Sequence, residues 1–197
     1  MSITVYTYND KVLKNVATDK WLKKKEIPTE ITLSNGQTWK LATLALNDGG
    51  EGIKIVNDVT ANGVNLGTIY YYTFAAAQRI ASIIPEGWHI PTSEEAQLLI
   101  DTYSNDIPAL CSVNGGWNDN LHGTNTSGFS AVPDGFYPGS PSVAGLGQSE
   151  FCQINSGTQY VSDVLEIGIN SGTLSRLRIT QCPVAGYIPI RLIKDSN

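Results

Sequence analysis

The stretch PEGWHIPTSEEAQLLI, residues 85–100, decides the fold, because it contains the complete start of a helix. Thr92 and Glu95 stand three residues apart, which predicts a capping box: each side chain accepts a hydrogen bond from the backbone N–H of the other residue. Pro91 favours extended backbone at the residue before it and so keeps helix out of that segment. From Thr92 to about Ser104 the apolar residues recur at helical spacing, which predicts a helix with one buried face.

Upstream of this helix the sequence predicts a second, shorter helix and two hairpin turns. Apolar residues at helical spacing predict a helix over Phe74–Ile84. Asn35-Gly36 joins two β-rich runs, Glu30–Leu33 and Thr38–Ala45, and Asn-Gly is the strongest two-residue signal for a hairpin turn. Asn62-Gly63 is a second such turn, and a further strand is expected at Gly52–Asn57.

Downstream of the capped helix, Gly, Asn, Ser and Pro dominate residues 111–160, which predicts long ordered loops with few regular elements. Three strands are then expected, at Tyr160–Ile169, Thr173–Thr180 and Tyr187–Ile193, the first two joined as a hairpin through Asn170-Ser171-Gly172. Pro189 cannot donate to a strand ladder, so the last strand is expected at an edge, or with Pro189 facing outward or at a bulge.

The composition limits the classes of function. The net charge of −5 argues against nucleic-acid binding through a general basic surface. No apolar run approaches the roughly 18 residues of a membrane helix, and no secretory signal is seen, so we expect a chain made in the cytoplasm without membrane insertion. Three cysteines, Cys111, Cys152 and Cys182, are an odd number without metal-type spacing, so no disulfide framework is expected and at least one thiol stays free.

The charge distribution separates an N-terminal arm, residues 1–29, from a main domain, residues 30–197. Residues 1–40 hold seven lysines against four acids, whereas the remaining 157 hold six basic residues against fourteen acids. The arm is expected to contain a strand at Ser2–Tyr8 and a basic helix or extended segment around Lys11–Lys25. Its tryptophan needs a cover, either a partner surface or the main domain. The candidate anchoring residues are Tyr6, Trp21, Lys23, Lys24 and Lys25.

Taken in order, these segments resemble the family of major paralogous domains first named from Fibrobacter succinogenes. The resemblance covers about residues 30–194. The segments that carry it are NGQTW (35–39), LALN (44–47), YTF (72–74), PEGWHIPTSEE (85–95), SGFSAVPDG (127–135) and IPIRLI (188–193).

The resemblance implies an α+β, C-type-lectin-like domain with two short helices, a small antiparallel sheet and long ordered loops, preceded by the arm. The family usually has a cysteine where this chain has Ile84, which agrees with a chain that does not meet an oxidising compartment. Relatives of this module are common on fibres and tails of phages of gut bacteria. The resemblance therefore implies a virion structural protein rather than a secreted, surface-anchored one.

Two short motifs invite a chemical reading, and for both a structural one is preferred. Trp88-His89 is expected to place Trp88 in the core and to bond His89 to backbone near the turn. Trp117-Asn118-Asp119 repeats the letters of the lectin calcium motif, with Asn120 and Asp134 as further oxygen donors, but it lies too early in the chain. His122 is the only other histidine, which excludes a histidine-rich metal site. No metal and no cofactor are expected.

The loops hold a candidate carbohydrate surface, since aromatic faces pack on sugar rings and small amides bind hydroxyls. Its candidate residues are Trp117, Asn118, Asp119, His122, Phe136 and Tyr137. Two alternatives stay open: the aromatic rings plug the long loops, or they contact a neighbouring subunit.

The expected function is therefore non-enzymatic, because no set of nucleophile, base and acid is visible. We expect a phage head- or tail-fibre or decoration protein, assembled in the host cytoplasm. Its arm attaches to other virion proteins, and its lectin-like domain serves host attachment by binding a surface glycan. A homotrimer is expected, as in many fibres. The alternative is a bacterial cell-surface or secreted module that binds carbohydrate or protein.

Overall fold

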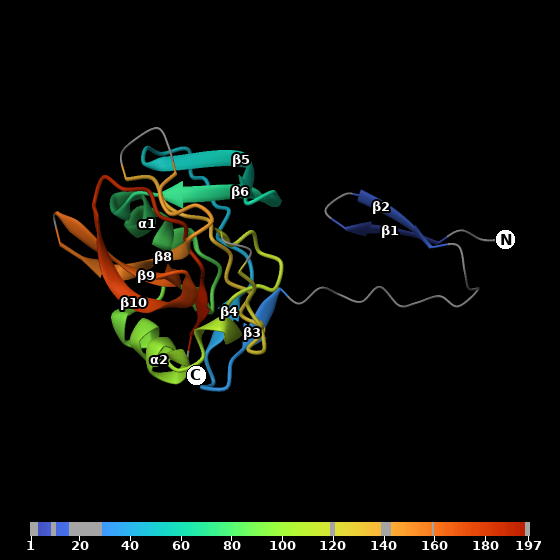
Figure 1. Cartoon of the computed structure of the whole chain (residues 1–197). Coiled ribbons are helices and arrows are strands. Elements are labelled where there is room, and N and C mark those ends of the chain that lie inside the picture. The colour runs from blue at the N-terminus through green and yellow to red at the C-terminus, as the bar shows by residue number, and fades with distance from the viewer. Residues whose placement is uncertain are drawn as a thin grey trace.

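The computed structural model describes residues 4–8, 11–15, 29–118, 121–138, 143–158 and 160–195, the first two ranges by their backbone only. The described chain combines few helices with several antiparallel sheets, so the predicted α+β class is confirmed (Figure 1). The helices are α1 (Phe74–Ile80) and α2 (Ser93–Tyr103), with the short 3₁₀ turns η1 (Ala81–Ile83) and η2 (Ile107–Ala109). The strands are β1 (Thr4–Tyr8), β2 (Lys11–Asn15), β3 (Glu30–Thr32), β4 (Thr38–Lys40), β5 (Ile53–Ala61), β6 (Val64–Tyr72), β7 (Trp88–His89), β8 (Ser149–Gly157), β9 (Val161–Asn170), β10 (Thr173–Pro183) and β11 (Ile193–Lys194).

Helix α2 begins as the sequence predicts. The Thr92 hydroxyl accepts from the Glu95 backbone N–H at 3.2 Å, and the Glu95 carboxylate accepts from the Thr92 N–H at 2.8 Å. Ala96, Leu99 and Tyr103 form its buried face. Both hydrogen bonds satisfy donors that the first turn leaves without partners inside the helix.

Helix α2 packs on one face of a three-stranded antiparallel sheet in which β9 lies between β10 and β8 (Figure 1). Its apolar face shares the main core cluster with Leu165 and Ile167 of β9, and with Trp39 of β4 and Trp117 from the loops. The opposite face of the sheet carries the residues of the other parity, among them Glu166. The sheet therefore has one face closed by a helix and one that the loops cover only in part.

The predicted turns are confirmed. β5 and β6 pair around Asn62-Gly63, and β9 and β10 pair around Ser171-Gly172, with positive φ at all four turn residues. β3 and β4 pair around Asn35-Gly36 and join a four-stranded sheet in the order β3-β4-β11-β7. Strand β2 pairs with β1 from Lys11 to Asn15, so the extended alternative is correct for these residues and the helical one is wrong.

Two predictions fail between residues 149 and 194. Residues 149–157 form β8, where loop was expected, because its first six residues are all buried and show no alternation of polar and apolar side chains. The expected strand Tyr187–Ile193 is regular only from Ile193. Its backbone bonds to different elements in turn, with Pro189 accepting from the Gln153 N–H at 2.9 Å. Pro189 is buried, so this segment runs through the interior and not along an edge.

The capping box gives a first prediction. Thr92→Ala should lower the free energy of unfolding by about 1 kcal/mol, because a backbone donor loses its partner. Thr102→Ala, near the other end of α2, is the matched control: the Thr102 hydroxyl donates to the Leu98 carbonyl at 2.6 Å and accepts an exposed bond from Asn35 Nδ2 at 3.2 Å, and alanine is the better helix former. The control should stay within about 0.5 kcal/mol of wild type in urea unfolding. Equal losses in the two variants would contradict the role of the cap.

Candidate functional site

The loop residues predicted to bind a ligand do not form one exposed surface. Trp117 is 1% exposed in the main core cluster, and Tyr137 is 6% exposed in another cluster, where it packs edge-on against Tyr71. Phe136 is half-buried against Phe151 in a third cluster. Rings covered by protein cannot stack on a sugar, so the assignment of Trp117 and Tyr137 as ligand platforms is corrected. They plug the loops, which was one of the alternatives.

The polar members of the predicted set lie apart from these rings. His122 is exposed, with its Nδ1 2.8 Å from the Val113 carbonyl oxygen. Asn118 is half-buried, and its backbone N–H donates to the Gly147 carbonyl at 2.7 Å. Asp119 lies outside the described residues, as do Trp21, Lys23, Lys24, Lys25 and the side chain of Tyr6. Among the described residues, no group of three or more His, Cys, Asp or Glu could hold a metal ion.

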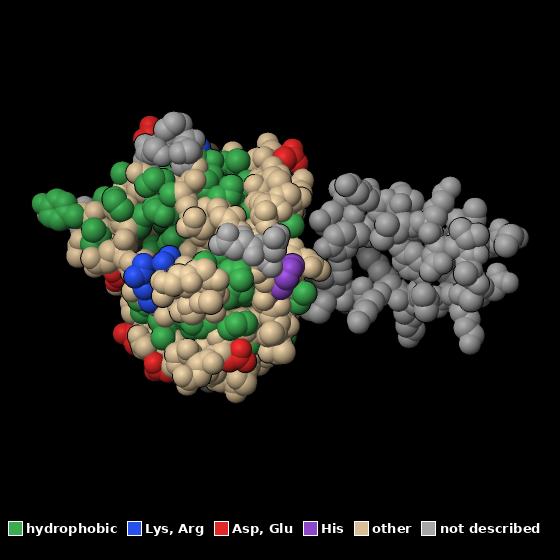
Figure 2. Space-filling model, viewed as in Figure 1, with side chains coloured by type: hydrophobic (Ala, Val, Ile, Leu, Met, Phe, Trp, Pro, Cys, Tyr) green, Lys and Arg blue, Asp and Glu red, His purple; other side chains and the backbone are tan. Residues whose placement is uncertain are grey.

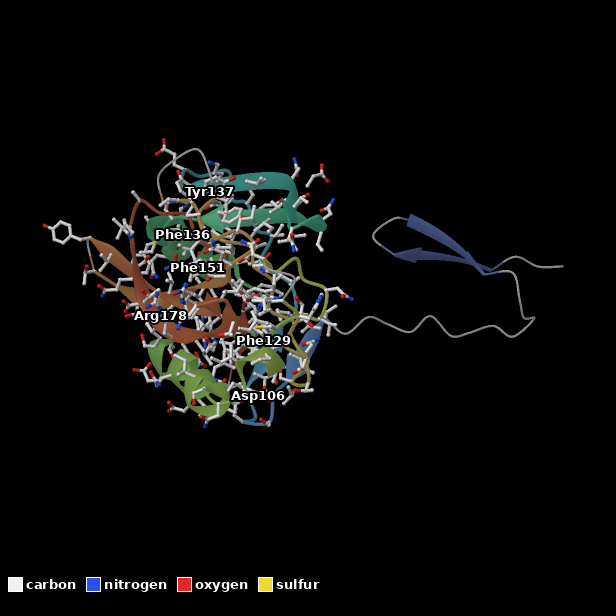
Figure 3. All side chains as sticks on the ribbon, viewed as in Figure 1. Asp106, Phe129, Phe136, Tyr137, Phe151 and Arg178 are labelled. Atoms are coloured by element: carbon white, nitrogen blue, oxygen red, sulfur yellow. The ribbon has the colours of Figure 1, made fainter. Side chains whose placement is uncertain are left out.

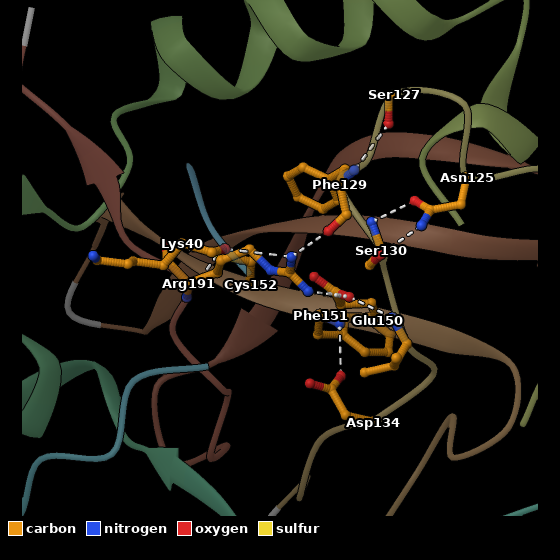
Figure 4. A network of polar contacts seen from close by, with 11 residues as sticks. Lys40, Asn125, Ser127, Phe129, Ser130, Asp134, Glu150, Phe151, Cys152 and Arg191 are labelled. Carbon is orange, nitrogen blue, oxygen red and sulfur yellow. Dashed lines mark hydrogen bonds and ion pairs between the residues drawn. The ribbon is translucent and has the colours of Figure 1, made fainter. Parts of the chain in front are cut away.

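A buried ion pair lies where the loops meet the sheet (Figure 4). Arg191 and Glu150 are 2% and 1% exposed, and Arg191 Nη2 donates to Glu150 Oε2 at 2.9 Å. Arg191 Nη1 donates to the Phe129 carbonyl at 2.7 Å, and the guanidinium lies 4.4 Å from the centroid of that ring. Glu150 Oε2 also accepts from the Val132 N–H at 2.6 Å. The pair thereby joins the C-terminal segment, the loops and β8.

Asp134 is a second buried carboxyl beside this pair. It is fully buried, and its Oδ1 accepts from the Phe151 N–H at 3.3 Å. Burial raises the pKa of Asp134 well above its usual range, and the charge of Glu150 raises it further. Burial also raises the pKa of Glu150, but there Arg191 and the Val132 N–H stabilise the charged form. Of the two carboxyls, Asp134 is therefore the one that burial shifts further toward its neutral form, and Glu150 is the one paired with Arg191.

This assignment gives a second prediction. Asp134→Asn keeps a neutral group of the same shape, so the free energy of unfolding should change by less than about 1 kcal/mol at pH 7. Glu150→Gln leaves Arg191 as an uncompensated buried charge and should cost about 3–5 kcal/mol. Chemical denaturation of the two variants measures both values. A loss in Asp134→Asn as large as that in Glu150→Gln would show that Asp134 is ionised.

His89 is bonded to two carboxylates, not to backbone as predicted. Its Nδ1 lies 2.6 Å from Asp195 Oδ1, and its Nε2 lies 2.9 Å from Glu95 Oε2. Both ring nitrogens must carry a proton to donate both bonds. Partial burial of the ring opposes its charge, but the hydrogen bonds to Glu95 and then Asp195 outweigh it and raise the pKa of His89. The imidazolium thus links β7, the start of α2 and the C-terminal segment.

The third prediction is the pH dependence of this link. Because the folded-state pKa of His89 is raised, its stabilisation is complete below the ordinary value of 6.5 and is lost as pH rises through the folded-state pKa. As pH rises from 6.5 through the folded-state pKa, wild type should therefore lose stability relative to His89→Gln. Asp195→Asn keeps an acceptor but removes one negative charge beside His89, and it should therefore reduce that loss. Parallel curves for wild type and His89→Gln would contradict the link.

Trp88 is half-buried beside the second core cluster, so its predicted core role is confirmed in part. The ammonium groups of Lys40 and Lys194 lie 3.9 and 5.6 Å from the centroid of its ring. Glu30 pairs with both lysines, at 3.3 and 3.4 Å. The exposed side of Trp88 is thus occupied by cations of this chain.

The three cysteines are free and buried. Burial raises the pKa of Cys111 and Cys152 to about 12 and that of Cys182 to about 11. At neutral pH these side chains are therefore thiols, the form that is neither nucleophilic nor metal-binding.

The partly open face of the β8–β9–β10 sheet carries a cluster of charged side chains, none of which is among the predicted site residues. Glu166, whose side chain is 4% exposed, accepts from Arg176 Nη1 at 2.9 Å and from Arg178 Nε at 2.8 Å. The Ser149 hydroxyl donates to the same carboxylate at 3.0 Å. Figure 3 labels Arg178 on the face turned to the viewer, and blue Lys or Arg side chains lie at the same place in Figure 2. We call Glu166, Arg176 and Arg178 the arginine face.

The sequence held a signal for the arginine face. Arg176 and Arg178 stand two residues apart in a predicted strand, so both point to the same side of the sheet. Glu166 lies in the predicted partner strand, and a bulge between Leu174 and Arg176, which shifts the register set by the turn, places it directly opposite Arg178. To predict the arginine face from the sequence, one needs the register between the two strands; the composition does not reveal it.

The comparisons with known proteins identify a family. The model of the Fibrobacter succinogenes major domain matches residues 12–153, which run from β2 into β8. No curated protein and no solved structure matches the chain. No helix among the described residues is long and apolar enough to cross a membrane.

Proposed function

The chain belongs to the Fibrobacter succinogenes major domain family, and from this membership we propose that it is a non-enzymatic structural protein of a phage virion. In this proposal residues 1–29 attach the protein to other virion proteins as a head- or tail-fibre or decoration component. Residues 30–197, with a C-type-lectin-like fold, present a surface that binds a host glycan.

The observation that carries the proposal is the way in which long irregular loops are fixed on a rigid frame. Between η2 and β8 the described backbone forms no regular strand. It is nevertheless held against the core, because the side chains of Trp117, Phe129 and Tyr137 are buried. The Asn125 side chain bonds both the N–H and the hydroxyl of Ser130, at 2.9 and 2.7 Å. Loops ordered before binding lose less entropy when a ligand arrives, which suits recognition.

The uneven distribution of charge along the chain supports a function for the arm that differs from that of the main domain. The first forty residues carry a net charge of +3 and the rest −8, so the two parts suit partners of different electrostatic character. Strands β1 and β2 give the arm a hairpin of its own. The low share of charged residues, 16%, would suit the alternative of a cell-surface or secreted binding module equally well.

Removal of the arm gives the fourth prediction. The full chain should form a homotrimer in native mass spectrometry, three times the 21.2 kDa monomer, and a chain of residues 30–197 should be monomeric. Antibody against the protein should detect it in purified phage particles. A scrambled arm of the same composition is the control, because it keeps the charge and removes the sequence.

A monomeric full chain that is absent from purified particles would overturn the virion proposal. If that chain were found on the bacterial surface or in the medium, the alternative would replace it.

A further inference from the structure

The arginine face carries more positive charge than its buried carboxylate needs. One guanidinium would neutralise Glu166, yet both Arg176 and Arg178 pair with it. Within the described part of the chain, Glu166 is the only carboxylate within 4 Å of either arginine. The cluster therefore keeps a net charge of +1 at the surface of a domain that is otherwise acidic.

Arg178 is held in place with donors to spare. Its side chain is 56% exposed, and it uses Nε for Glu166. Its two Nη groups donate to no acceptor among the described residues. Because Glu166 is buried and also bonded to Ser149, it fixes the guanidinium plane before any ligand arrives. A fixed pair of Nη donors matches the two oxygens of a carboxylate.

The neighbours of Arg178 on this face suit a sugar ring. Phe151 lies directly opposite Glu166 on β8 but is only 8% exposed, so the apolar edge is the half-buried Phe136, which packs against Phe151 with ring centroids 4.8 Å apart. Figure 3 shows both aromatic residues on the same side of the molecule as Arg178. Thr180, two residues along β10, adds a half-buried hydroxyl on the same face. A charge, an apolar edge and a hydroxyl are the three contacts that an acidic sugar can use.

We propose that the arginine face binds the carboxylate of an acidic saccharide, such as a hexuronate, with Arg178 as the principal contact. The carboxylate follows from the arginines, whereas the choice of a saccharide rests on the proposed function. The net charge of −8 on residues 41–197 repels polyanions, so the face favours a ligand with a single carboxylate over an acidic peptide.

The test uses methyl β-D-glucuronide, with methyl β-D-glucoside as its uncharged counterpart, added to the full chain. The glucuronide should shift the ¹H–¹⁵N signal of Arg178 Nε in a saturable way, and the glucoside should not. Arg178→Gln should weaken glucuronide binding at least about tenfold, and Arg178→Lys should restore only part of it, because lysine lacks the planar pair of donors.

Arg79→Gln is the matched control, since Arg79 is also a surface arginine bonded through Nε to a carboxylate, that of Asp48 at 2.6 Å. It should bind the glucuronide like wild type. Because Arg176 and Ser149 still bond Glu166, Arg178→Gln should remain folded, and its melting curve checks this.

Four results would overturn the inference. If the glucuronide causes no shift of the Arg178 signal, the arginine face is not an anion site. If acetate binds with the same affinity as the glucuronide, the sugar ring makes no contribution and the ligand is not a saccharide. Tighter binding of a poly-glutamate peptide would assign the face to acidic proteins. A glycan array separates this inference from the proposed function: if both wild type and Arg178→Gln bind glycans, but no acidic glycan binds wild type more tightly than the variant, the proposed function stands and the inference is refuted.

Discussion

The rest of the structure depends on the buried pair of Arg191 and Glu150. Taking two charges out of water is costly, and here the cost is offset by the pairing itself and by hydrogen bonds from distant parts of the chain, although Glu150 Oε1 and Arg191 Nε stay without a partner among the described residues. The guanidinium bonds the carbonyl of Phe129 and the carboxylate bonds the N–H of Val132, so the loop between these residues can hold only one position. A loop with little secondary structure is thereby tied to the sheet by hydrogen bonds to a buried ion pair.

The two faces of the β8–β9–β10 sheet differ in character, although each contributes to a buried cluster. The face under α2 is apolar and closed, with Leu165 and Ile167 in the main core cluster. The other face holds Glu166 at its centre and leaves Arg178 exposed. Alternation along β9 alone produces this separation, since neighbouring residues point to opposite sides. The frame can therefore tolerate changes on the arginine face without loss of the core.

Local signals in the sequence predicted local structure well. Thr92 and Glu95 placed the start of α2, and Asn62-Gly63 placed a hairpin, because these features depend on residues close in sequence. Strand β8 was missed because its polar residues are buried by partners from β9 and the C-terminal segment, which the sequence does not bring together. The arginine face was missed for the same reason, and the buried rings Trp117 and Tyr137 were taken for surface ones. What could not be predicted is register and burial, the results of long-range packing.

The three buried cysteines can report local unfolding of the core, because their thiols are covered in the folded protein. Cys111 and Cys152 belong to the main core cluster and Cys182 to the cluster of Phe151, so a thiol reagent reaches them only when that part of the core separates. The rate at which a thiol reagent alkylates each cysteine measures how often the core around that cysteine unfolds locally, and no label has to be introduced. The rate of local unfolding can thus be measured separately in two regions. Cys111 and Cys152 report on the core beneath α2, and Cys182 reports on the cluster behind the arginine face.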